Sequence, residues 1–68
     1  MTLVFARNHQ EAKIWAERHH LHPREWIYID SPETCKGMRG CSVAYVGTWV
    51  RREDQAEIMQ AIRKWVCT

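Results

Sequence analysis

Three short apolar runs, each followed by a segment of helical character, constrain the fold of this sequence most strongly. The runs cover residues 2–6, 26–29 and 42–46, and the third could extend to Trp49. Continuous apolar runs of this length are typical of strands that are covered on both faces. Strands that alternate with helices predict an α/β fold with parallel strands and right-handed crossovers.

A first helix is predicted over residues 9–20. Asn8 and Glu11 have the spacing of a capping box, and Pro23 prevents the helix from continuing. The apolar face of this helix carries Ala12, Trp15, Ala16 and His19.

A second full helix is predicted to begin near residues 53–54, where two acidic side chains suit the positive end of a helix dipole. A shorter helical turn is expected over residues 31–36, because Ser31 and the proline after it have the chemistry of a helix start. The second helix shows the helical spacing of apolar residues at Ile58, Ala61, Ile62, Trp65 and Val66.

The predicted fold is one small α/β domain over residues 1–68. It has a three-stranded, mainly parallel sheet in the order strand, helix, strand, short helix, strand, helix. The link over residues 32–40 is shorter than the roughly twelve residues usual in a parallel crossover, so an antiparallel third strand is the alternative.

The chain is short for a domain that must be stabilised by its own core. A domain of 68 residues buries only about 60% of the surface of its extended chain. Four tryptophans are more than so small a core can hide, and apolar residues at 65–67 suggest that this end is docked on something. We therefore expect a two-fold homodimer.

Charge and cysteine content restrict the setting in which the protein acts. Ten basic and eight acidic residues are spread along the chain, so nucleic-acid binding is possible but not favoured. No apolar run is long enough to span a membrane, and no signal-peptide pattern is present. The odd number of cysteines, three, favours reduced thiols, so we expect a cytoplasmic protein. No cofactor is expected.

The carboxyl ends of the predicted parallel strands form the best candidate for a binding site, because ligands of such folds bind at this edge. Arginines, helix starts and small polar residues meet there and could hold an anion, a nucleotide or a nucleic acid. The candidate ligand- or partner-binding residues are Arg7, Asn8, Ser31, Arg39, Trp49, Arg51 and Arg52.

The histidines and cysteines could support two kinds of chemistry, metal binding and thiol catalysis. The histidines at 19, 20 and 22 and the cysteines at 35, 41 and 67 do not have the ligand spacing of structural zinc sites. Cys35 lies near the start of a helical turn, where its pKa could fall, but no base is placed beside it. A disulfide between Cys35 and Cys41 is disfavoured in a reducing cytoplasm. We therefore expect no metal site and no catalytic residues.

Met38-Arg39-Gly40 is followed by the apolar run of the third predicted strand. With this pattern a segment of about twenty residues resembles the stretch before the Walker B strand of terminase and helicase ATPases. The strand ends in Val46-Gly47-Thr48-Trp49, which lacks the acidic pair of those families, and the sequence has no phosphate-binding P-loop. Magnesium-dependent hydrolysis of a nucleotide is therefore not expected.

Four features occur along the whole chain: Arg7-x-His9-x-Glu11-Ala12, Trp26-x-Tyr28, Ser31-Pro32 with Arg39-Gly40, and Trp49. With these features the chain as a whole resembles small uncharacterised accessory proteins of actinobacterial tailed phages. This resemblance implies a non-enzymatic interaction module that acts on a host or phage protein in the host cytoplasm, and it transfers no catalytic residue.

Overall fold

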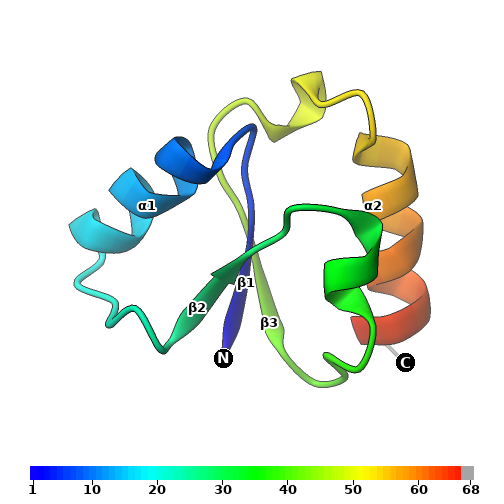
Figure 1. Cartoon of the computed structure of the whole chain (residues 1–68), viewed down its shortest axis with the longest axis horizontal. Coiled ribbons are helices and arrows are strands. Elements are labelled where there is room, and N and C mark those ends of the chain that lie inside the picture. The colour runs from blue at the N-terminus through cyan, green and yellow to red at the C-terminus, as the bar shows by residue number, and fades with distance from the viewer. Residues whose placement is uncertain (67–68) are drawn as a thin grey trace.

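The computed structural model describes residues 1–66 and shows one sheet with helices on both faces (Figure 1). The strand order is β2-β1-β3, and both pairings are parallel. The predicted three-stranded α/β fold is confirmed, with a parallel third strand. The strands are β1 (Thr2–Phe5), β2 (Trp26–Tyr28) and β3 (Ser42–Tyr45).

The connection from β2 to β3 crosses back over β1 through a single short 3₁₀ helix, η1 (Pro32–Cys35). Each strand ends one residue earlier than predicted. The connection therefore runs from residue 29 to residue 41 and has the length that a parallel crossover needs.

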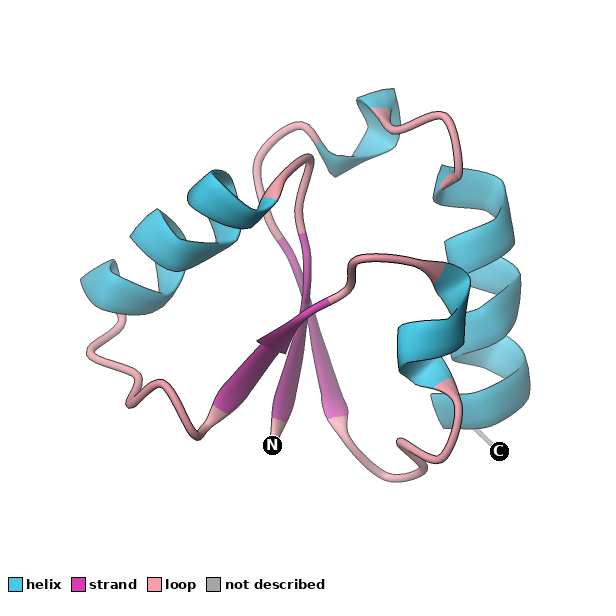
Figure 2. Cartoon of the chain, in the orientation of Figure 1, coloured by secondary structure: helices cyan, strands magenta, loops and turns pink. Residues whose placement is uncertain are grey.

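Helix α1 (His9–Arg18) packs on one face of the sheet, while α2 (Gln55–Ala61) and η1 pack on the other (Figure 2). A π-helical turn, η3 (Ile62–Val66), continues α2. Alternate residues of the central strand point to opposite faces and so divide the core in two. Val4, Ala6, Ala12 and Val46 are buried on the α1 side, and Leu3, Phe5, Ile29, Cys35, Ile58 and Ile62 on the α2 side.

One helix end and one strand end differ from the sequence prediction. Helix α1 ends at Arg18, because His20 adopts a left-handed conformation with φ 55° and turns the chain. After β3, Gly47 also has a positive φ, of 57°, and the 3₁₀ helix η2 (Trp49–Arg51) follows. The third strand therefore does not extend to Trp49.

The C-terminal end of α2 and η3 packs on the chain's own core. Val66 is buried, and its carbonyl accepts a hydrogen bond of 3.2 Å from the backbone N–H of Gly40. Cys67, one of the apolar residues on which the predicted homodimer rests, lies outside the described residues. Within residues 1–66 no helix is long and apolar enough to cross a membrane.

Candidate functional site

The carboxyl ends of the strands lie beside the start of α1. Strands β2 and β3 lie on opposite sides of β1, and ligands of such sheets bind where the connections diverge. Glu11, in the first turn of α1, lies at this place. Its carboxylate accepts hydrogen bonds from the backbone N–H groups of Arg7, at 3.1 Å, and of Thr48, at 3.3 Å. Its own N–H donates to Asn8 Oδ1 at 2.8 Å. The N–H groups that could face an anion here therefore already bind a carboxylate of the chain.

Gly47 permits this close approach of β3 to α1. A Cβ atom at this position would lie 2.5 Å from the carboxyl carbon of Glu11, and the positive φ also favours glycine. The two features together place Thr48 within hydrogen-bonding distance of Glu11.

Arg52 links the ends of β1 and β2 from the loop before α2. Its guanidinium donates to the backbone carbonyls of Ala6 (3.1 Å), Ile29 (2.6 Å) and Asp30 (2.9 Å). It also makes two hydrogen bonds to Asp54, of 2.9 and 3.0 Å. The side chain is only 8% exposed, so Arg52 stabilises the edge at which sequence analysis placed an anion.

Tyr28 contacts the same guanidinium. Its hydroxyl lies 3.2 Å from Arg52 Nη1, and its ring centroid lies 5.4 Å from Arg52 Cζ. Burial raises the pKa of Tyr28, and the positive charge of Arg52 partly opposes this rise. The phenol is therefore neutral at physiological pH.

The other predicted site residues divide between the two ends of the sheet. Arg7, Asn8 and Arg51 are exposed at the carboxyl edge, and Ser31 is half-buried there. Arg39 precedes β3 and so belongs to the opposite edge.

Trp49 is half-buried and packs on the core beside the carboxyl edge of the sheet. Its ring centroid lies 4.9 Å from that of Phe5 and 5.2 Å from that of Tyr45. A large part of its surface is thus unavailable for stacking on a base.

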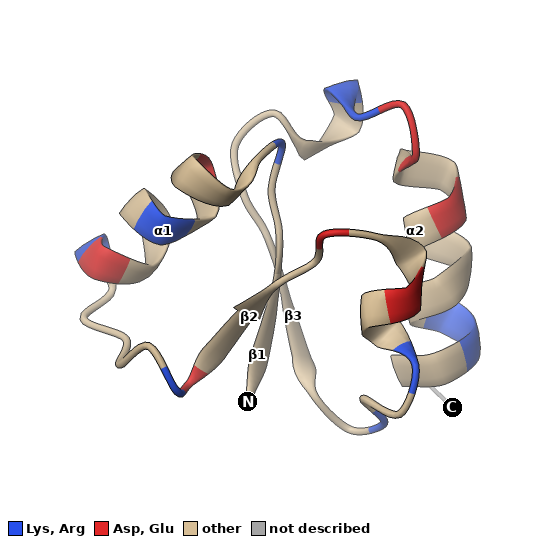
Figure 3. Cartoon of the chain, viewed as in Figure 1, with Lys and Arg blue, Asp and Glu red and all other residues tan. Residues whose placement is uncertain are grey.

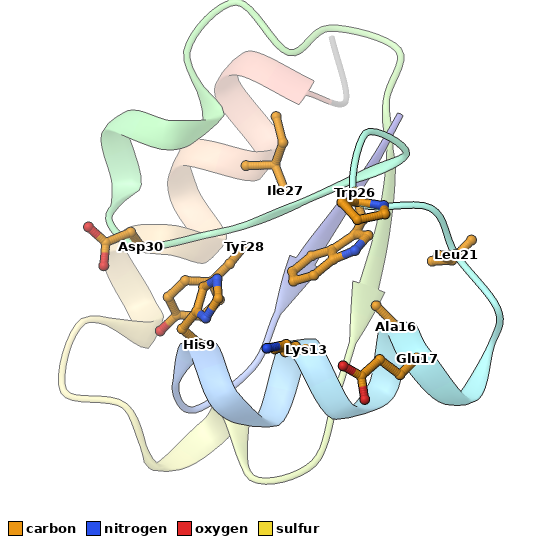
Figure 4. A pocket seen from close by; sticks show the side chains of 10 residues that line it. His9, Lys13, Ala16, Glu17, Leu21, Trp26, Ile27, Tyr28 and Asp30 are labelled. Carbon is orange, nitrogen blue, oxygen red and sulfur yellow. The ribbon is translucent and has the colours of Figure 1, made fainter.

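A groove of about 760 Å³ runs between α1 and β2 and was not indicated by the sequence. Figure 4 shows Trp26 pointing toward α1, while His9 lies beside Tyr28 near Asp30. The groove is lined by His9, Lys13, Ala16 and Glu17 of α1, Leu21 and Pro23 of the connection, and Trp26, Ile27, Tyr28 and Asp30 of β2 and its end.

Aromatic contacts fix one end of this groove. The His9 ring packs edge-on against Tyr28, at 5.5 Å between centroids, and lies 5.9 Å from Trp26. Trp26 and Tyr28 are both half-buried, although they share the α1 face of the sheet. The Trp-x-Tyr alternation of β2 indicates that both aromatic side chains lie on one face of the sheet. The groove itself depends on the position of α1 above them.

The cysteine hypothesis requires a correction. The position of Cys35 near a helix start predicts a lowered pKa, but Cys35 is fully buried, and this burial raises the pKa of its thiol. Within the described residues no three His, Cys, Asp or Glu side chains come close enough together to hold a metal ion. Cys67 of the zinc alternative lies outside this part of the chain.

Comparison with protein-family models, curated proteins and solved structures found no match to this chain.

Proposed function

We propose that the chain is a protein-interaction module that receives an apolar segment of another protein in the groove between α1 and β2. The observation that carries the proposal is the groove itself, of about 760 Å³, with Trp26 and Tyr28 half-buried on its floor. Aromatic side chains in such a position are typical anchors of protein interfaces.

The rim of the groove adds polar contacts of both signs. Lys13 and Glu17 are exposed on α1, and Asp30 is exposed at the end of β2. A segment with apolar residues between charged ones fits this arrangement, because its apolar side chains fill the groove and its charges meet the rim.

The distribution of charge supports a protein partner over a nucleic acid. Figure 3 shows Lys and Arg interspersed with Asp and Glu along the elements. Nucleic-acid binding needs several cations that face the phosphates together.

The resemblance to small proteins of actinobacterial tailed phages supports a partner among host or phage proteins. It also supports action in the bacterial cytoplasm as an accessory factor without catalytic activity of its own.

Selection of random displayed peptides on the immobilised chain tests this proposal. We expect enriched peptides with large apolar residues, whose binding shifts the amide resonances of Ala16, Leu21 and Trp26. Trp26→Ala should weaken their binding by about tenfold or more, as loss of an interface anchor does.

The matched control for this experiment is Ile14→Ala. Ile14 is also apolar and 44% exposed on α1, but it does not line the groove. Failure to enrich any peptide over an unrelated protein, or resonance shifts confined to α2, would refute the proposed function.

Anion or nucleotide binding at the carboxyl edge of the strands is the second proposal. The exposed Arg7 and Arg51 favour it. The bonds of Glu11 to two backbone N–H groups and the engagement of Arg52 make it the weaker one. Titration with nucleotides and oligonucleotides at low salt should change the fluorescence of Trp49 if this proposal is correct, and an unchanged signal would rule it out.

A further inference from the structure

The outer edge of β2 offers unoccupied backbone pairing positions beside the groove. β2 is an edge strand of the described sheet, with β1 on one side only. The carbonyl of Glu25 and the N–H of Ile29 face β1, where they bond Thr2 and Val4 at 2.9 Å each. Because backbone groups alternate along a strand, Trp26 and Tyr28 direct theirs to the outer edge.

We infer that this edge pairs with β2 of a second copy of the chain, antiparallel and about a two-fold axis at Ile27. The inference rests on the proposed function, since it concerns the edge that borders the groove. An axis at Ile27 sets Trp26 opposite Tyr28 of the second copy, and Tyr28 opposite its Trp26. The outward groups of the two strands then exchange four hydrogen bonds, and two aromatic pairs lie side by side.

Charge complementarity favours a second copy as the occupant. Arg24 lies two residues before β2, and Asp30 lies two residues after it; both are exposed. Antiparallel pairing brings the Arg24 end of each strand to the Asp30 end of the other, and so creates two ion pairs. Within residues 1–66 the only ion pair observed joins Arg52 to Asp54, so the side chains of Arg24 and Asp30 are not engaged in another.

The β3 edge lacks this self-complementarity. β3 (Ser42–Tyr45) is preceded by Gly40 and Cys41 and followed by residues 46–48, so no pair of opposite charges stands at its two ends. Two-fold pairing of β3 would therefore gain no ion pairs.

Pairing through β2 also enlarges the proposed binding surface. Side chains directly opposite each other in an antiparallel pair lie on the same face of the sheet. The two α1 helices therefore lie on one face, and the two grooves meet at the axis in a single trough floored by Trp26 and Tyr28 of both copies.

Sedimentation velocity with charge-reversal variants tests the inference. Arg24→Asp leaves two acidic ends that repel in its homodimer, and Asp30→Arg leaves two basic ends. We expect the wild-type chain to be dimeric at micromolar concentration and each variant to associate at least about tenfold more weakly. An equimolar mixture of the two variants should recover the dimer, since every Asp then faces an Arg.

Arg51→Asp is the matched control, because Arg51 is an exposed arginine away from β2, and it should leave the dimer intact. A monomeric wild-type chain, or single variants that dimerise as tightly as the wild type, would overturn the inference. A separate measurement distinguishes groove binding from dimerisation: the affinity of the groove-selected peptides for the monomeric Arg24→Asp variant. Binding to this variant would uphold the proposed function even if the wild-type chain is a monomer.

Discussion

Arg52 is the residue on which the carboxyl edge of the sheet depends most. It donates to carbonyls at the ends of both β1 and β2, and its guanidinium also lies 5.6 Å from the ring centroid of Phe5. Arg52→Ala leaves these carbonyls and Asp54 without their partner, so we expect the free energy of unfolding to fall by about 3 kcal/mol. Urea denaturation measures this loss.

The neighbouring residue provides the control for this prediction. Arg51 is exposed, and Arg51→Ala should change the free energy of unfolding by no more than about 0.5 kcal/mol. Equal effects of the two substitutions would show that Arg52 has no special structural role.

Gly47 is predicted to tolerate a side chain less well than Gly37. Both have a positive φ, but only at Gly47 would a Cβ meet another atom, the carboxyl carbon of Glu11 at 2.5 Å. Gly37→Ala should cost about 1–2 kcal/mol for the left-handed conformation alone, and Gly47→Ala clearly more. The extra cost should shrink in a Glu11→Ala background, as measured by a double-mutant cycle. A cost that is independent of Glu11 would contradict this contact.

Alkaline pH is predicted to destabilise the fold through the buried Cys35 and the half-buried Tyr28. Burial raises the pKa of Cys35 above 9.0 and that of Tyr28 above 10.0. The unfolded chain then loses these protons at lower pH than the folded chain does. The stability they contribute is fully present below about pH 9 and is lost as the pH rises through the folded pKa values.

Urea denaturation between neutral and alkaline pH measures this effect. Cys35→Ala should remove the part of the fall in the free energy of unfolding that begins at the lower pH. This holds whatever the substitution does to stability at neutral pH. A free energy of unfolding that stays constant through this range would contradict the burial of both groups.

Residue roles could be predicted from the sequence where the partners are close along the chain. The pairing of Asn8 with Glu11 was recognised from its spacing, and Asn8 Oδ1 indeed accepts from the Glu11 N–H. The Glu11 side chain, however, also accepts a hydrogen bond from the distant Thr48, and Arg52 reaches the distant residues Ala6 and Ile29. Local patterns contain no information about such long-range partners.

At the scale of elements, apolar runs and helical periodicity predicted all three strands and both full helices. Their ends moved by one or two residues, because single residues such as His20 in a left-handed conformation stop the elements. The short 3₁₀ helix η2 and the π-helical turn η3 were not predicted, since no simple periodicity marks them. The groove could not be predicted either, because it depends on how α1 packs against β2.

At the scale of the molecule, three strands leave two edges that no further strand of residues 1–66 covers. Exposed edges pair readily with other chains unless charge, proline or covering elements protect them. The outer edge of β2 has none of these within Trp26–Tyr28, and it borders the apolar groove. We therefore propose that this protein interacts through β2 and the face of α1 beside it.

Amide hydrogen exchange of Trp26 and Tyr28 tests this central claim most directly. If β2 pairs with a second copy, both amides should become protected as the protein concentration rises, and the Arg24→Asp variant should lose this protection. The Ile29 amide, which donates to Val4, should be protected at every concentration and serves as the internal reference. Rapid exchange of both amides at high concentration, unchanged by Arg24→Asp, would contradict the pairing of β2 with a second copy.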